Sequence, residues 1–210
     1  MASTMHEVDE VDRDAAAPVA HIQHDTNTGI SNTKLAMWLF LGSECLLFGG
    51  LITTYLIYKT PLPGQGPGNE LFDIPFTSAS SFVLLMSSLT MVLAVSAIER
   101  GDHHRLRVWL GATGVLGALF ISGQVYEFTA FYREGLGFTT NRFSSAFYAL
   151  TGFHGVHVSV GIVMLVSLLL LSIRGHLPEH RSETVEIVGL YWHFVDVVWI
   201  LIFAVVYLIP

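Results

Sequence analysis

The sequence predicts an all-α membrane protein with five transmembrane helices. Hydrophobic residues make up 52% of the 210 residues and charged residues only 13%, against about 25% charged in soluble domains. The hydrophobic residues gather in runs that each exceed the ~20 residues needed to cross ~30 Å of hydrocarbon as a helix. An unpaired backbone amide is very unfavourable in lipid, so a segment that crosses the membrane must be a helix or a strand of a closed barrel. These runs lack the alternation of polar and apolar residues that barrel strands show, so they are predicted to be helices. The five runs are Leu35–Tyr58, Phe76–Ile98, Val108–Tyr132, Ala146–Ile173 and Ile187–Ile209.

The segment before the first run, residues 1–33, is predicted to be a disordered cytoplasmic tail. It carries much of the net charge of −7, and within its first fourteen residues Arg13 is the only basic one. This excess of acidic residues argues against nucleic acid as a partner. Because a polar segment of this length precedes it, the first run is predicted to be a transmembrane helix and not a cleavable signal. Residues 34–210 are predicted to form the five-helix bundle. The acidic residues of the tail's first part are Glu7, Asp9, Glu10, Asp12 and Asp14.

Lysine and arginine are distributed unevenly between the two sides of the predicted bundle. The side of the N-terminus holds seven and the opposite side holds three. Because positive charge is concentrated in cytoplasmic loops, the N-terminus is predicted to be cytoplasmic and Pro210 to lie outside. The outside segment Thr60–Pro75 contains four prolines and is predicted to be an irregular turn region. The seven are Arg13, Lys34, Arg100, Arg105, Arg107, Arg174 and Arg181, and the three are Lys59, Arg133 and Arg142.

Ionisable residues occur inside three of the runs, at a depth where they are unfavourable and tend to be functional. Glu44 lies nine residues into the first run, ~14 Å deep and close to the midplane. His154 and His157 share a face of the fourth run, and His193 and Asp196 repeat this spacing in the fifth.

Other charged residues are predicted at the membrane surface. Glu127 lies ~29 Å into the third run and is predicted to be an anchor at the outer interface, facing Arg133 or Arg142. Arg100 and Arg105 belong to a short charged cytoplasmic loop, predicted to set the topology and to contact lipid headgroups.

Each group at membrane depth has a structural and a functional interpretation. Glu44 is either a protonated carboxyl that holds helices together or a group that takes up and releases protons. The histidine pairs form either a metal or haem site or an interhelical hydrogen-bond network in which Asp196 fixes a histidine tautomer. The nearby Gly152, Gly155 and Gly161 indicate close helix packing, which favours the network.

Several classes of protein are excluded by what the sequence lacks. Cys45 is the only cysteine, so neither an intrachain disulfide nor a cysteine-held iron–sulfur cluster can form. A dinuclear copper centre with two cysteine ligands is excluded for the same reason. The sequence also contains no phosphate-binding loop, dinucleotide fingerprint or nucleophile elbow.

Two segments are far more specific than general membrane sequence. Residues 151–158 read TGFHGVHV and residues 191–199 read YWHFVDVVW. Together they resemble subunit III of cytochrome c oxidase. Three further segments agree with this family in order along the chain: Phe40–Phe48 with Glu44, the loop Glu99–Asp102, and the pair Tyr126–Glu127. The resemblance covers residues 35–209 and leaves out the acidic tail.

The resemblance implies a non-catalytic subunit of a haem–copper respiratory oxidase in the bacterial cell membrane, an enzyme that reduces oxygen to water and pumps protons. Such a subunit carries no cofactor or metal. It packs on the haem-bearing subunit I, with copper-bearing subunit II and a small subunit IV as further partners. It also binds phospholipid, supports proton uptake and protects the enzyme from inactivation during turnover. Glu44 matches the buried carboxylate of the family, whereas His154, His157, His193, Asp196 and Glu127 match structural polar positions.

Three alternatives remain open from the sequence. The first is subunit III of a quinol oxidase, although Glu44, where those relatives often have aspartate, favours a cytochrome c oxidase. The second is an autonomous proton or ion transporter using Glu44 and Asp196, for which the usual inverted repeats or broken helices are not visible. The third is a membrane haem or metal enzyme using the histidines. The long form of the family also has two additional helices before the carboxylate-bearing one, and this chain starts at the latter.

Overall fold

The computed structural model describes residues 31–59, 74–175 and 182–209. These residues form five helices and a final π-helical turn, with no strand among them. All five helices are long and apolar enough to cross a membrane, which confirms the predicted fold class. The predicted disordered tail, apart from its last residues, lies outside the described residues. The elements are α1 (Asn32–Lys59), α2 (Ile74–Glu99), α3 (His103–Arg133), α4 (Arg142–Ile173), α5 (Ser182–Phe203) and η3 (Ala204–Leu208).

Helices α3, α4 and α5 begin four or five residues earlier than hydropathy alone predicts. Their first turns are polar, so hydropathy excludes them, but capping groups satisfy amides at the starts of α3 and α4. The side chain of Asp102 accepts a hydrogen bond from the Arg105 amide at 3.0 Å, and Asn141 forms a capping box with Ser144. Pro75 also belongs to a helix rather than to the predicted turn region. It lies in the first turn of α2, where a missing N–H group is harmless. The rest of that region lies outside the described residues.

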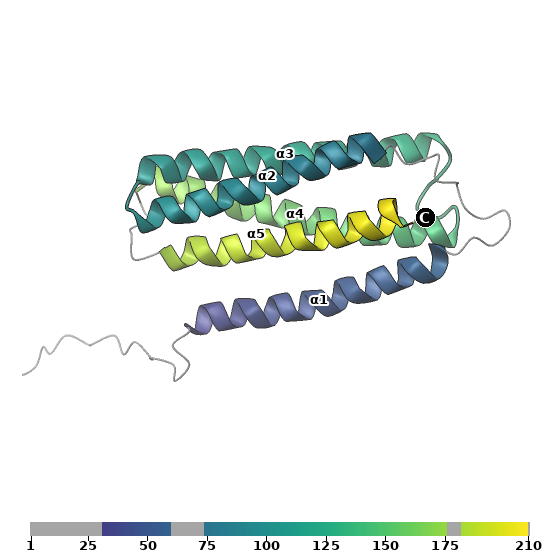
Figure 1. Cartoon of the computed structure of the whole chain (residues 1–210), viewed down its shortest axis with the longest axis horizontal. Coiled ribbons are helices and arrows are strands. Elements are labelled where there is room, and N and C mark those ends of the chain that lie inside the picture. The colour runs from purple at the N-terminus through teal and green to yellow at the C-terminus, as the bar shows by residue number, and fades with distance from the viewer. Residues whose placement is uncertain (1–30, 60–73, 176–181, 210) are drawn as a thin grey trace, which may run out of the picture.

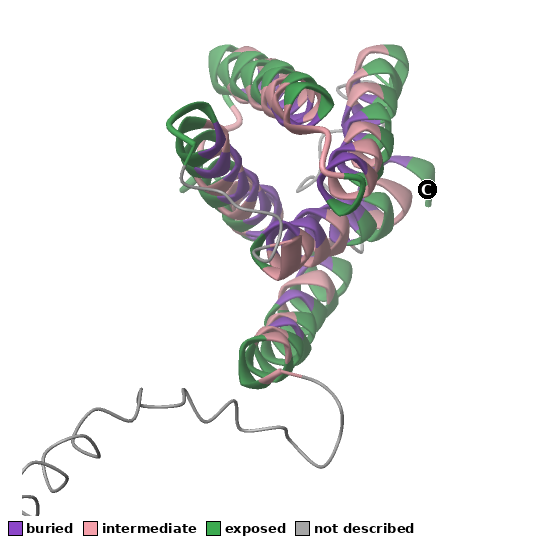
Figure 2. Cartoon of the chain, turned by 90° about the vertical axis from the view of Figure 1, so that its left-hand side faces the viewer, coloured by how far each residue is buried: buried purple, intermediate pink, exposed green. Residues whose placement is uncertain are grey.

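The helices α2, α3, α4 and α5 form a four-membered ring, and α1 packs on its outside against α4 and α5 (Figure 1). The end view of Figure 2 shows α1 beside the other four, its buried residues facing them. Only Leu41, Phe48 and Tyr55 of α1 are buried. They are seven residues apart, two helical turns, so α1 contacts the ring along one narrow stripe. Most of the remaining surface of α1 is exposed, toward lipid or a neighbouring protein.

The centre of the ring is filled by Trp192 of α5, which is fully buried. Its ring lies between two glycines of facing helices: a Cβ at Gly117 of α3 would come within 2.6 Å of it, and a Cβ at Gly161 of α4 within 2.8 Å. Its indole N–H donates to the Ser87 hydroxyl of α2 at 2.9 Å. One side chain therefore contacts all three other helices of the ring, and the two glycines make the space for it.

The end of the bundle where α1, α3 and α5 begin is named the inner end, after the predicted orientation, and the opposite end the outer end. The orientation itself stays a prediction. α1 begins at Asn32, two residues inside the predicted tail. These positions place Glu44 ~18 Å along α1 and Asp196 ~21 Å along α5, both at mid-depth.

We expect Gly161→Ala to destabilise the bundle, because the added methyl group would overlap the Trp192 ring. Overpacking of this kind costs about 1–3 kcal/mol. Gly152→Ala on the same helix is the matched control, since a Cβ there meets nothing within 4 Å. Thermal unfolding in detergent measures the difference. Equal unfolding midpoints for the two variants would contradict the role given to Trp192.

Candidate functional site

The Glu44 carboxyl and the His157 imidazole join α1 to α4 at mid-depth. The Oε2 atom of Glu44 lies 3.1 Å from Nε2 of His157, and the two side chains are 14% and 15% exposed. On its other side the imidazole contacts the Phe48 ring, with the ring centroids 5.1 Å apart. The pair is therefore enclosed on one side and open on the other.

The backbone determines how many protons this pair holds. The other ring nitrogen of His157, Nδ1, lies 2.7 Å from the carbonyl oxygen of Phe153. A carbonyl only accepts hydrogen bonds, so Nδ1 carries a proton and Nε2 faces Glu44. A hydrogen bond between Nε2 and the carboxyl then needs one more proton, which belongs either to Glu44 or to His157. The geometry thus gives a carboxyl–imidazole pair that shares one proton in the membrane.

His154 lies one turn away from His157 in a different environment. It is fully buried, and neither ring nitrogen has a hydrogen-bond partner within the described chain. Its ring stacks on Trp199 with centroids 4.9 Å apart, and it meets the edges or faces of Phe48 and Phe120. Aromatic rings surround this imidazole and leave it no open side for a ligand.

The polar side chains of α5 at mid-depth are His193 and Asp196. His193 faces α2 and not α4. The Ser88 hydroxyl of α2 lies 2.6 Å from Nδ1 of His193. Asp196 is 3% exposed, and neither of its carboxyl oxygens has a hydrogen-bond partner among the described residues. Ser88, which sequence reasoning did not single out, is therefore the residue that links His193 to the next helix.

The predicted single network of two histidine pairs needs correction. His157 bonds to α1, His154 lies among aromatic rings, and His193 bonds to α2. Helical spacing places residues on one face, but the rotation of each helix decides which neighbour that face meets. The direct hydrogen-bond partner of His193 is likewise Ser88 rather than Asp196. Among the residues described, no three His, Cys, Asp or Glu side chains converge as metal ligands would.

Glu127 is buried in the bundle near the outer end and is not the surface anchor that the sequence predicted. It is 7% exposed and accepts hydrogen bonds from Thr77 of α2 at 3.0 Å and from Tyr207 of η3 at 2.8 Å. The neighbouring Tyr126 is the exposed one, at 66%. The position of Glu127 along its apolar run did not show that the side chain points into the bundle, because its hydrogen-bond donors, Thr77 and Tyr207, come from two other elements. The π-helical turn carries one of them, Tyr207.

Both ends of α1 are attached by lysines whose roles the sequence did not reveal. At the inner end, Lys34 forms an ion pair with Glu186 of α5 at 2.5 Å, and Ser31 bonds to Glu183. At the outer end, Lys59 donates to the carbonyl oxygens of Val205, at 2.9 Å, and Ile209. Lys59 therefore occupies the C-terminal end of the last helix, where a positive charge is favourable.

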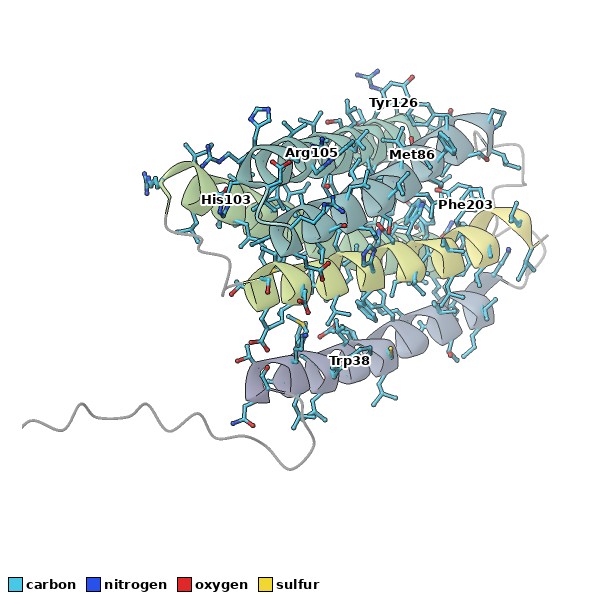
Figure 3. All side chains as sticks on the ribbon, turned by 60° about the vertical axis from the view of Figure 1, so that its left-hand side comes forward. Trp38, Met86, His103, Arg105, Tyr126 and Phe203 are labelled. Atoms are coloured by element: carbon cyan, nitrogen blue, oxygen red, sulfur yellow. The ribbon has the colours of Figure 1, made fainter. Side chains whose placement is uncertain are left out.

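The predicted interfacial arginines lie at the inner end, where the turn between α2 and α3 is tight. Arg100 and Arg105 are exposed, and Figure 3 shows Arg105 and His103 toward the end opposite Tyr126. Arg100 donates to Ser96 at 2.6 Å, and Arg105 lies 3.2 Å from Asp102. The hydrogen bond from the Arg105 amide and the positive charge of Arg105 hold the pKa of Asp102 below its usual value.

An apolar groove of about 480 Å³ runs between α3 and α4 at mid-depth and opens to the outside of the bundle. Gly152 and Gly155 of α4 line it, together with Gln124 of α3. The Gln124 amide donates to the Thr151 carbonyl at 2.8 Å, and a Cβ at Gly155 would come within 2.8 Å of its oxygen. Gly155 therefore makes room for the end of the Gln124 side chain, whereas a Cβ at Gly152 would meet nothing within 4 Å.

A family model described as "Cytochrome c oxidase subunit III" matches residues 2–209, a longer stretch than the resemblance that began at residue 35. The chain is 40% identical to cytochrome c oxidase subunit 3 of Bacillus sp. (strain PS3), over 91% of this chain and 92% of that protein. It is 43% identical to the protein of the same name from Synechocystis sp., over 81% of this chain and 73% of that protein. It is also 38% identical to quinol oxidase subunit 3 of Bacillus subtilis (strain 168), over 90% and 92%.

We expect Tyr207→Phe to loosen the outer end, because it removes one donor from the buried Glu127 carboxyl. Removing one partner of a buried polar group costs about 1–3 kcal/mol. Tyr126→Phe, adjacent to Glu127 but exposed, is the control and should stay within about 0.5 kcal/mol of the parent protein. Unfolding in detergent followed by circular dichroism compares them; a Tyr126→Phe effect as large as that of Tyr207→Phe would disprove the assignment.

Proposed function

The chain belongs to the cytochrome c oxidase subunit III family, and on this premise we propose that it is the non-catalytic subunit III of a cytochrome c oxidase. Family membership makes it a multi-pass component of a multi-subunit haem–copper terminal oxidase in a bacterial membrane. The finer assignment covers its role within that complex. In this role the chain carries no redox centre and supports the proton uptake of the catalytic subunit.

The observation that carries this role is the shared proton of Glu44 and His157. A carboxyl and an imidazole 3.1 Å apart at mid-depth form a group that gains or loses a proton without leaving two buried charges of the same sign. The pair is slightly open on one side, so protons can exchange with a neighbouring protein surface. Its place between α1 and α4 also gives it a structural task, because it attaches α1 to the ring.

Haem and copper belong to partner subunits in this proposal. The sequence has a single cysteine, Cys45, too few for a dinuclear copper centre held by two thiolates. The aromatic rings around His154 leave no room for haem iron at that imidazole. The chain's own contribution is therefore to hold, orient and protect, and the redox chemistry is supplied by the haem-bearing subunit I and the copper-bearing subunit II.

Lipid is the second expected ligand. The groove between α3 and α4 is apolar, lies within the hydrocarbon region and opens outward, which suits a phospholipid acyl chain. The outer face of α1, with exposed residues such as Trp38 and Leu46, is available for subunit I, for a small subunit IV or for further lipid.

The electron donor has two candidates, cytochrome c and quinol. Relatives named for cytochrome c oxidase and for quinol oxidase are similar to the chain at 38–43% identity. Glutamate at position 44 supports cytochrome c as donor. Subunit III of a quinol oxidase is the second candidate, supported by the relative of that name from Bacillus subtilis.

Mild-detergent purification of the chain from its native membrane tests the proposal. We expect a large haem-bearing subunit and a copper subunit to co-purify, with reduced-haem bands in the optical spectrum. Oxidation of cytochrome c by the preparation supports the cytochrome c assignment, and oxidation of quinol alone overturns it. Recovery of the chain alone and colourless, under conditions that keep other respiratory complexes intact, would favour the autonomous transporter.

Glu44→Gln tests the role of the shared proton. Glutamine can still donate to His157, so we expect normal assembly and unchanged haem spectra. Proton-uptake rate or turnover lifetime should fall by a modest factor, below the ~10²-fold or larger loss expected for a group that transfers protons in the chemical step. Glu99→Gln, an exposed glutamate at the inner end, is the control. Complete loss of electron transfer in an assembled Glu44→Gln complex would contradict a supporting role.

A further inference from the structure

Asp196 is a buried carboxyl in the middle of the membrane. It lies ~21 Å along α5, is 3% exposed, and neither of its oxygens has a hydrogen-bond partner within the described chain. An ionised carboxylate without such bonds is strongly unfavourable in lipid. A bound proton removes that charge, so the neutral acid is the stable form of Asp196 at rest.

Two polar side chains lie on the α2–α5 seam beside this carboxyl. His193 lies one turn before Asp196 on the same face of α5, and its Nδ1 lies 2.6 Å from the Ser88 hydroxyl of the facing helix α2. Ser88 and His193 are partly exposed, whereas Asp196 is buried. Within the described residues the second ring nitrogen of His193, Nε2, has no hydrogen-bond partner. The three residues thus form a line from a closed interior to the outside of the seam between α2 and α5.

No other ionisable group competes for Asp196 within the described chain. The facing helix α2 carries none between Ile74 and Ile98. On the other helices that pack against α5, Glu44 and His157 bond to each other, and His154 is enclosed by aromatic rings. Glu186, which pairs with Lys34 at the inner end, lies about three turns from Asp196 along α5, and Glu183 lies further away.

We propose that Asp196 is a proton-binding site and that Ser88 and His193 form the relay by which protons reach it from the α2–α5 surface. The entrance of the relay is Nε2 of His193. This site goes beyond the proposed function, in which the shared proton belongs to Glu44 and His157 on the opposite side of α5.

Each transfer along the relay conserves protons and charge. In the deprotonated form, Ser88 donates to the Asp196 carboxylate and accepts from the Nδ1–H group of His193. A proton binds Nε2, the Nδ1 proton passes to the Ser88 oxygen, and the former Ser88 proton passes to Asp196. The imidazole and the carboxyl are then both neutral, and Nε2 carries the proton that entered. Reversal of the same steps releases it.

Infrared spectroscopy of the purified complex tests this site directly. A protonated carboxylic acid has a carbonyl-stretch band separate from that of a carboxylate, and the band shifts in D₂O when the proton exchanges. We expect one such band to disappear in Asp196→Asn and to remain in Glu44→Gln. In Ser88→Ala and His193→Phe the band should remain, but its exchange in D₂O should slow by about 10²-fold, the usual contribution of one positioned proton-transfer group.

Ser81→Ala is the matched control for the relay. Ser81 lies on the same seam and accepts from the Trp199 indole at 2.8 Å, so its loss disturbs packing without interrupting the line to Asp196. Its exchange rate should equal that of the parent complex. Equal exchange rates in the Ser88→Ala and Ser81→Ala variants would overturn the relay, and an unchanged band pattern in Asp196→Asn would overturn the site.

The test does not depend on whether Asp196→Asn assembles or on whether the proposed function is right. Labelling with ¹³C-aspartate identifies the aspartic band in protein that keeps Asp196, and the two serine variants are then compared on that band. Haem content and oxidase activity are read separately from the same preparations. Loss of haem with the band and its relay intact would therefore count against the proposed function alone.

Discussion

The indole of Trp192 determines how closely the four helices of the ring approach one another. It fills the centre from α5, lies between the glycines of α3 and α4 and donates its N–H group to α2. In lipid there is little hydrophobic force between helices, so packing and interhelical hydrogen bonds hold a bundle together. A large ring in a space made by two glycines supplies both. Because this contact sets the rotation of α5, it also determines where Tyr191, His193 and Asp196 face.

Serines on α2 complete this arrangement. Ser81 and Ser87 each accept a hydrogen bond from a tryptophan of α5, and Ser88 meets His193. Each bond removes an otherwise unpaired polar group from contact with lipid. The same bonds hold α2, which has no ionisable side chain at membrane depth, against α5, which has His193 and Asp196 there. Ser81 and Ser87 thus hold α2 against α5, whereas Ser88 on the same helix belongs to the proposed relay to Asp196.

Helix α1 is attached in a different way from the rest. Three buried side chains, two turns apart, form its apolar contact, and polar bonds from Lys34, Glu44 and Lys59 act at the inner end, the middle and the outer end. A helix with so narrow a buried stripe leaves most of its surface for other molecules. This suits a subunit that functions within a larger membrane complex, and it gives the Glu44–His157 pair a role in both attachment and proton exchange.

Much of this protein follows from its sequence alone. Five helices follow from five long apolar runs, because backbone amides in lipid have no alternative. The chemistry available at mid-depth follows from Glu44, the histidines and Asp196, and the two long motifs were sufficient to identify the family. The tertiary structure decided which groups meet. His154 lies among aromatic rings, whereas His157 bonds to Glu44. The direct partner of His193 is Ser88 and not Asp196, and Glu127 faces inward and accepts from Tyr207. Hydropathy and spacing are local properties of one helix, whereas partners depend on the rotation of each helix against its neighbours. That rotation is set by the fit of distant side chains, here Trp192 with Gly117 and Gly161.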